Sequence, residues 1–156
     1  MLEAPRIIET AARPVAVIHI VVPRAEMQNV MKPGIDEVMA CVAAQGIAAA
    51  GPWFTHHKRK PSDTFDFEVG VPVDAPVVAS GRVKPGELPA ARVARTVYHG
   101  GYEGLGAAWG EFETWIKANG HEPAPNLWEC YAVGPESSPD PAAWRTELNR
   151  PLIGSD

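Results

Sequence analysis

Glu129 and Tyr131 are the residues whose types and spacing are best suited to chemistry, because they alternate within the short apolar segment 126–133. This segment is predicted to be a β-strand, in which side chains two positions apart point to the same face. A carboxylate enclosed by apolar groups costs several kcal/mol unless it is protonated, paired or bound to a cation. Two interpretations stay open: a buried acid suited to a cationic ligand, and a wet acid on the solvent side of an antiparallel sheet.

Aromatic residues are the second signal, since five tryptophans are many for 156 residues. Trp109 and Trp115 fall on one face of the helix predicted over 105–116, and this spacing favours core packing for both. Tyr98 and Tyr102 flank a His-Gly-Gly turn between a predicted strand and that helix. A tyrosine at such a junction can face a cleft, so both are candidates for contact with a ligand.

The glycine, histidine and cysteine patterns match no cofactor-binding or metal-binding motif, so we expect neither a cofactor nor a metal. The glycine-rich run 100–106 lacks the spacing of phosphate-binding loops, and a turn that opens a helix explains it. His56 and His57 are adjacent and point to opposite faces of a strand, so they cannot bind one metal ion together. The basic run 56–60 is interpreted as a solvated hairpin tip. Two distant cysteines form neither a disulfide framework nor a zinc motif, and no serine or cysteine nucleophile motif is present.

The length of 156 residues predicts one domain, residues 1–156, with enough chain to bury a hydrophobic core. A formal net charge of −5, from 14 basic and 19 acidic residues, argues against a nucleic-acid partner. No stretch reaches the roughly 18 apolar residues that a membrane span needs, and the N-terminus has no signal-peptide pattern. We therefore expect a cytoplasmic protein with no membrane partner.

The predicted elements occur twice in the same order, as strand, helix, strand, strand. Repeat one covers about residues 14–73 and repeat two about 90–152, joined by a Pro- and Gly-rich connection with room for a further short strand. Met31 to Gly34 is predicted to be a turn before the first helix, and Gly46 and Gly120 are predicted to end the two helices. The predicted strands are 14–22, 51–57, 64–71, 91–98, 126–133 and 144–149, and the helices are 35–42 and 105–116.

The two repeats can be aligned at shared glutamate and tryptophan residues, with small insertions that increase the offset between them. This alignment gives Glu129 an apolar counterpart in the first repeat, which weakens the solvated interpretation of that residue. The matched pairs are Trp53 with Trp128, Phe54 with Glu129, His56 with Tyr131, and Glu68 with Glu147.

A resemblance to a known family is carried by five segments: Asp66–Pro72, Tyr98–Tyr102, Trp115–Ile116, Trp128–Tyr131 and Trp144–Leu152. On these segments, and in the same order along nearly its whole length, the chain resembles the GyrI-like small-molecule-binding domain. This is the effector-binding domain of AraC-type and multidrug-sensing regulators. The resemblance implies an α+β fold of two pseudo-twofold-related strand–helix–strand–strand repeats. In that fold an antiparallel sheet covers two helices, and a central ligand cleft lies between the halves.

The resemblance also implies a function and a site. The glutamate of the Glu-x-Tyr strand lies in the cleft of such domains among aromatic residues, and the ligands are bulky aromatic compounds that are often cationic. A carboxylate in a low-dielectric cleft supplies charge, and each aromatic face adds about 0.5–2 kcal/mol of cation–π attraction. The implied ligand-binding residues are Glu129, Tyr131, Tyr102, Tyr98, Phe54, His56 and Trp109.

The resemblance leaves two functions open. Because the two repeats use the length of the chain and leave no room for a helix-turn-helix module, we expect a stand-alone domain that senses or sequesters small molecules. The alternative is an enzyme, since some stand-alone relatives resemble hydrolases that open the cyclopropane ring of DNA-alkylating compounds. Glu129 would then be the general base, and Tyr131 or Tyr102 the hydrogen-bond donor. Binding of a protein partner ranks below both.

Overall fold

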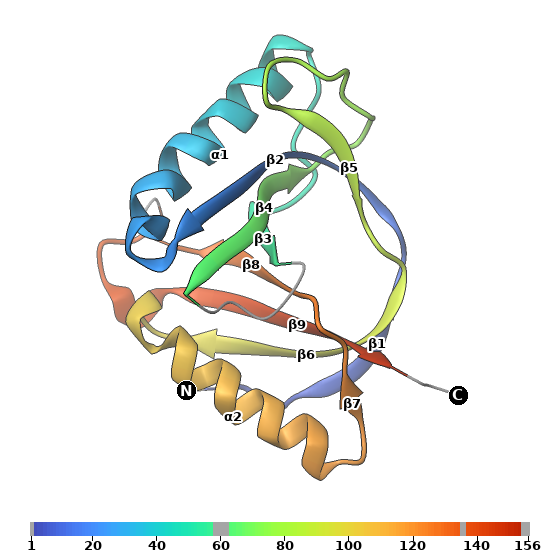
Figure 1. Ribbon diagram of the computed structural model, residues 1–156, viewed down its shortest axis with the longest axis vertical. Coiled ribbons are helices and arrows are strands. Elements are labelled where there is room, and N and C mark those ends of the chain that lie inside the picture. The colour runs from blue at the N-terminus through green and yellow to red at the C-terminus, as the bar shows by residue number, and fades with distance from the viewer. Residues whose placement is uncertain (1, 58–62, 135–136, 154–156) are drawn as a thin grey trace. The chain divides into compact units, whose positions relative to one another are not determined.

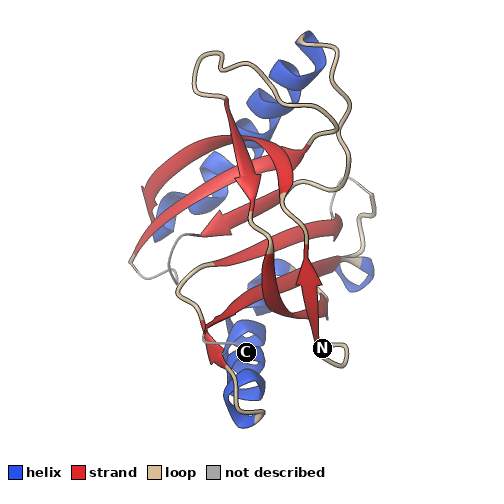
Figure 2. Ribbon diagram, turned by 90° about the vertical axis from the view of Figure 1, so that its right-hand side faces the viewer, coloured by secondary structure: helices blue, strands red, loops and turns tan. Residues whose placement is uncertain are grey.

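The computed structural model describes residues 2–57, 63–134 and 137–153, which form two compact units (Figure 1). Each unit is an antiparallel sheet with one helix, and Figure 2 shows the helix lying against one face of its strands. The predicted α+β class is confirmed. Within the described ranges, neither helix is long and apolar enough to cross a membrane. The predicted solvated hairpin tip at 56–60 is wrong for His56 and His57, which are buried in a strand, and its residues 58–60 lie outside the described residues.

The central unit, Ala11–Ala90, pairs its strands in the order β3-β4-β2-β5. Its helix α1 packs on one face because alternate apolar residues of β2 and β4 point toward it. Ile18 and Val69 form a cross-strand pair on this face, and they are buried with Val38 and Val42 of the helix. The elements are β2 (Arg13–Pro23), η1 (Arg24–Glu26), α1 (Met27–Ala44), β3 (Phe54–His57), β4 (Thr64–Pro72) and β5 (Lys84–Leu88).

Helix α1 begins earlier than predicted and runs through the expected turn at Met31–Gly34, so that prediction is wrong. Pro33 lies inside the helix, where it lacks the N–H that would bond to the fourth preceding carbonyl. Gly34 faces the sheet, and a Cβ there would lie 3.1–3.3 Å from three apolar side chains of β2 and β4. The Pro-Gly pair therefore serves close packing of helix on sheet rather than a turn.

The terminal unit combines Met1–Thr10 with Ala91–Asp156 and pairs its strands in the order β1-β6-β9-β8, with β7 added on β9. Helix α2 buries Ala108, Phe112 and Ile116 against the sheet residues Tyr98 and Leu148. The elements are β1 (Arg6–Thr10), β6 (Ala91–His99), η2 (Tyr102–Gly104), α2 (Leu105–Ala118), β7 (Glu122–Pro123), β8 (Leu127–Val133), η3 (Pro141–Ala143) and β9 (Arg145–Ile153).

The main strands lie where the alternation of apolar residues predicts them, and both helix ends are confirmed. Gly46 and Gly120, with φ of +69° and +81°, follow α1 and α2. Strand β5 falls in the connection that has room for a short strand. Strands β1 and β7 are not predicted. β1 pairs with β6, about 85 residues away in sequence (for example Ile8 with Val93), and no local turn signal announces a pairing between such distant segments.

The register of the two sheets corrects the predicted match between the repeats. Glu129 pairs with Leu148 and faces its unit's helix, whereas Phe54 pairs with Gly70 and faces away from α1. Thr55, the next residue of β3, is the one that faces α1. The alignment on tryptophan is thus off by one position, because Trp53 lies before β3 while Trp128 lies inside β8. With Glu68 kept on Glu147, the corrected pairs are Thr55 with Glu129 and His57 with Tyr131.

Candidate functional site

The candidate site is built around Glu129 on β8 of the terminal unit. Only 9% of this residue is exposed, so the solvated interpretation is wrong. Tyr131 donates its hydroxyl to Oε1 at 2.6 Å, and Trp109 donates its indole N–H to Oε2 at 2.6 Å. The predicted placement of Glu129 and Tyr131 on one strand face is confirmed, and the structure adds the donor from α2.

The local fold explains why Trp109 reaches the acid. Phe112, one turn further along α2, is fully buried against the sheet, and the Trp109 ring packs on it at a centroid distance of 5.8 Å. Both residues lie on α2, so the burial of Phe112 holds this face of the helix on the sheet, and the ring contact supports Trp109 beside it. Trp109 therefore fulfils the predicted packing role and also directs its N–H toward β8. Its second role depends on tertiary position, so helical spacing alone does not reveal it.

Burial raises the pKa of the Glu129 carboxyl, because desolvation disfavours the ionised form. The hydrogen bonds from Tyr131 and Trp109 oppose this shift, since both stabilise the carboxylate. Both donors are neutral, and none of the basic side chains in the described ranges forms an ion pair with Glu129. The site thus holds an acid whose negative charge has hydrogen-bond donors but no counter-charge within the described chain.

Aromatic rings extend from this acid. The Tyr102 ring meets Tyr131 edge-on at 5.8 Å and lies tilted on Trp144 at 4.9 Å. Trp144 is held in turn by its indole N–H, which donates to the Ser138 carbonyl at 2.9 Å. Trp144 is absent from the predicted set of ligand-binding residues, although its place at the start of a family-like segment is a signal that points to it.

Tyr98 has a different place from the one predicted for it. It is buried, and its hydroxyl donates to the carbonyl of Gly101 at 3.0 Å. A Cβ at Gly104 would overlap that same hydroxyl. Tyr98 therefore shapes the turn through which β6 leads into α2, and its hydroxyl is engaged by the backbone rather than by the acid.

Phe54 and His56 belong to the central unit. Both are buried in β3, on the face that points away from α1, and His56 pairs with Glu68 of β4. The structure therefore brings together Glu129, Tyr131, Tyr102 and Trp109 in the terminal unit, and it describes Phe54 and His56 within the other unit.

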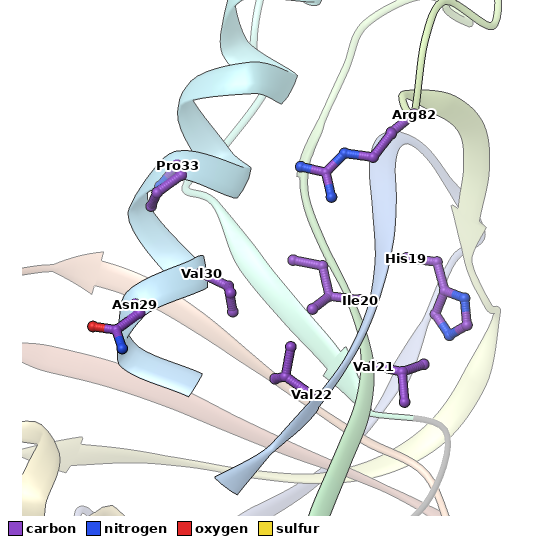
Figure 3. Close-up of a pocket in the computed structure, with 8 residues that line it drawn as sticks. All are labelled: His19, Ile20, Val21, Val22, Asn29, Val30, Pro33 and Arg82. Atoms are coloured by element: carbon purple, nitrogen blue, oxygen red, sulfur yellow. The ribbon is translucent and has the colours of Figure 1, made fainter. Parts of the chain in front are cut away.

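A cavity of about 260 Å³ lies in the central unit between β2 and α1 (Figure 3). Ile20 and Val22 of β2 point toward Val30 of α1, and Arg82 reaches over the gap from the connection before β5. The Arg82 guanidinium is engaged by Glu37 at 2.7 Å. None of the predicted ligand-binding residues lines this cavity. Among the described side chains, no three His, Cys, Asp or Glu residues are grouped to hold a metal ion.

Comparison with known proteins gives a family match and several structural neighbours. The family model of the GyrI-like small molecule binding domain matches residues 3–152. The crystal structure of the EcmrR C-terminal domain superposes with a TM-score of 0.85 at 21% identity, covering 97% of this chain and 98% of that one. In the EcmrR–DNA complex the match has a TM-score of 0.84 at 21% identity, and it covers 96% of this chain but only 57% of the EcmrR chain.

Two structural neighbours of lower identity are described differently, one by a bound ligand and the other as a hydrolase. SAV2435 bound to tetraphenylphosphonium superposes with a TM-score of 0.70 at 11% identity, covering 97% of this chain and 95% of that one. A hydrolase from Listeria innocua superposes with a TM-score of 0.62 at 12% identity, covering 95% and 91% of the two chains. No curated protein sequence matches the chain. At these identities, the structural likenesses show the fold alone.

Proposed function

Because the chain belongs to the GyrI-like small-molecule-binding family, we propose that it binds bulky aromatic cations and that Glu129 provides their counter-charge. The observation that carries this proposal is a buried carboxyl group whose two hydrogen-bond donors, Trp109 and Tyr131, are both neutral. Burial raises the pKa of Glu129, so the ionised form is disfavoured when no cation is bound. A cation that reaches the carboxylate adds an attraction that neither donor supplies.

Trp109 supports this proposal because it covers the carboxyl group from α2 while remaining only half-buried itself. A ligand that displaces the indole from Glu129 exchanges one neutral N–H donor for a full positive charge. This exchange strengthens binding most where little water is present, because the attraction between the cation and the carboxylate is then screened less. Glu129 is thus suited to bind a cation that is large enough to take the place of the Trp109 ring.

The aromatic rings beside the acid suit the same class of ligand. Tyr102, Tyr131 and Trp144 offer ring faces and edges within one continuous set of contacts. A cation over such a face gains about 0.5–2 kcal/mol, and flat ligand rings can stack on it. The binding of tetraphenylphosphonium by SAV2435 makes this compound a suitable first probe.

Calorimetric titration with tetraphenylphosphonium tests the proposal. Glu129→Gln keeps the shape of the side chain and removes its charge, so we expect affinity to fall at least about tenfold, or roughly 1.4 kcal/mol. Glu111→Gln removes the same charge from an exposed position on α2 and should leave affinity unchanged. Equal affinity of the wild type and the Glu129 variant, with both folded, would overturn the proposal.

A hydrolase is the second candidate, favoured by the Tyr131 hydroxyl that lies 2.6 Å from a carboxyl group of raised pKa. Such an acid–phenol pair can activate water and donate a hydrogen bond to a developing oxyanion. Water would add to a strained cyclopropane: one ring C–C bond breaks, one of its carbons gains the hydroxyl group, and the other gains the proton. Incubation with a cyclopropane-bearing indole compound, followed by mass spectrometry, would detect the adduct of one water. Tight binding without that adduct would leave the binding function and remove the enzymatic one.

A further inference from the structure

Thr146 on β9 is a buried polar residue beside the proposed site. It is fully buried, and its Oγ1 has no hydrogen-bond partner among the described residues. A buried hydroxyl that makes no hydrogen bond destabilises the folded protein, because it has lost its bonds to water without replacing them. A valine would suit a buried strand equally well without that cost, because it has nearly the same shape. The hydroxyl therefore calls for a role beyond packing.

The strand register places this hydroxyl next to the acid. Thr146 pairs directly with Tyr131 on β8 and with Tyr98 on β6, so the three side chains form one row on the face that carries Glu129. Directly opposite residues have Cβ atoms about 4.5–5.5 Å apart, and Glu129 occupies the diagonal position at about 7–8 Å. A group bound at the acid is thus within a side chain's length of Thr146.

Neither neighbour in the row engages Thr146. The Tyr131 hydroxyl donates to Glu129, and the Tyr98 hydroxyl donates to the Gly101 carbonyl. Both flanking phenols are therefore committed elsewhere, and Oγ1 keeps its donor and its acceptor capacity. A polar group that arrives with a ligand can form this bond without breaking an existing one.

We infer that Thr146 is a specificity-determining residue, which favours aromatic cations that carry a hydroxyl or amino group on a ring. The inference rests on the function proposed above, because Glu129 brings the cation to this face of the sheet. A site built to bond a polar group discriminates strongly against analogues that lack it, since its own buried group then stays without a partner. Charge would set whether a ligand binds, and Thr146 would set which ligand binds best.

A matched pair of probes tests this inference: tetraphenylphosphonium and (4-hydroxyphenyl)triphenylphosphonium, which differ by one phenolic hydroxyl. We expect the wild type to prefer the hydroxylated probe by about fivefold to tenfold. Thr146→Val should abolish this preference, leave tetraphenylphosphonium affinity unchanged, and keep or raise the melting temperature. Thr146→Ser, which retains a hydroxyl, should restore the preference. If the valine variant does not fold, Thr146→Ala provides the same comparison.

The outcomes separate the two proposals. A wild type that binds both probes equally, or a valine variant that keeps the preference, would overturn the role of Thr146 and leave the role of Glu129 intact. If wild type and Glu129→Gln bind tetraphenylphosphonium with equal affinity, or the wild type binds neither probe, the proposed function fails and the inference fails with it.

Discussion

At the scale of single residues, burial, hydrogen bonding and charge all act on the carboxyl group of Glu129. Its raised pKa means that the folded protein holds the proton to higher pH than the unfolded chain does. Between the unfolded and the folded pKa, the folded state binds more protons, so stability falls as pH rises. The acid therefore costs the protein stability at neutral pH, a cost that the proposed function would explain.

Glu129→Gln should therefore stabilise the protein at neutral pH, by roughly 1 kcal/mol or more, because an amide avoids the desolvation of a charge. The gain should shrink as pH falls, and it should be smallest below the ordinary pKa of glutamate, where the carboxyl group is neutral in both states. Urea unfolding of both proteins across a pH series measures this difference. A glutamine variant that is less stable at neutral pH, and shows the wild-type pH slope, would contradict the assignment.

His57 in the central unit has the opposite behaviour. It is stacked on Phe67 at a centroid distance of 5.2 Å, and burial lowers its pKa to about 4. The unfolded chain then binds more protons between pH 4 and 6.5, so stability is lost as pH falls through this window. The shift corresponds to roughly 3 kcal/mol.

His57→Leu should remove this acid sensitivity, because leucine carries no titrating group. We expect the variant to lose less stability than the wild type as pH falls from 6.5 to 4, because the contribution of His57 is absent. Thermal unfolding across the same pH range gives the comparison. Parallel profiles for the two proteins would show that another group causes the acid loss.

At the scale of elements, the start of α2 decides where Trp109 meets β8. This start is set by the contact between Tyr98 and Gly104, because any side chain at position 104 would overlap the tyrosine hydroxyl. By contrast, Gly110 on the exposed side of α2 has nothing within 4 Å of an added Cβ. One glycine is thus required by packing, and the other is not.

Gly104→Ala should destabilise the protein by roughly 1–3 kcal/mol, since the clash forces either the helix start or the tyrosine to shift. Gly110→Ala should stabilise it by up to about 1 kcal/mol, because alanine is the better helix former. Chemical denaturation of the two variants tests this contrast. Equal effects of the two substitutions would mean that Tyr98 yields easily and does not set the position of α2.

The same elements show which features of the site can be predicted from the sequence. The alternation of Glu129 with Trp128 and Tyr131 predicts which side chains share a face, because strand geometry is local. The donation from Trp109 is not predictable in this way, since it depends on how α2 is placed on the sheet. Pro33 and Gly34 mislead for a related reason: as a pair they are typical of a turn, yet here tertiary packing keeps them in a helix.

At the scale of the whole molecule, the two units place different chemistry on the strand face that points toward their helix. The terminal unit carries Glu129 and Tyr131 toward its helix, where the central unit carries Thr55 and His57. His57 meets Phe65 edge-on and stacks on Phe67, so aromatic contacts surround it where the other unit has Tyr131 beside an acid. Within the described residues, the buried acid with neutral partners therefore belongs to the terminal unit, which makes this unit the centre of the proposed binding function.

Proton release on ligand binding tests the central claim most directly. If a cation binds the ionised form of Glu129, then at a pH below the raised pKa of this carboxyl group a proton must leave as the ligand binds. Titration with tetraphenylphosphonium in buffers of different ionisation enthalpy should detect release of up to one proton per ligand in the wild type, with affinity that rises with pH. The Glu129→Gln variant should release none. Binding by the wild type without proton release and without pH dependence would contradict the account.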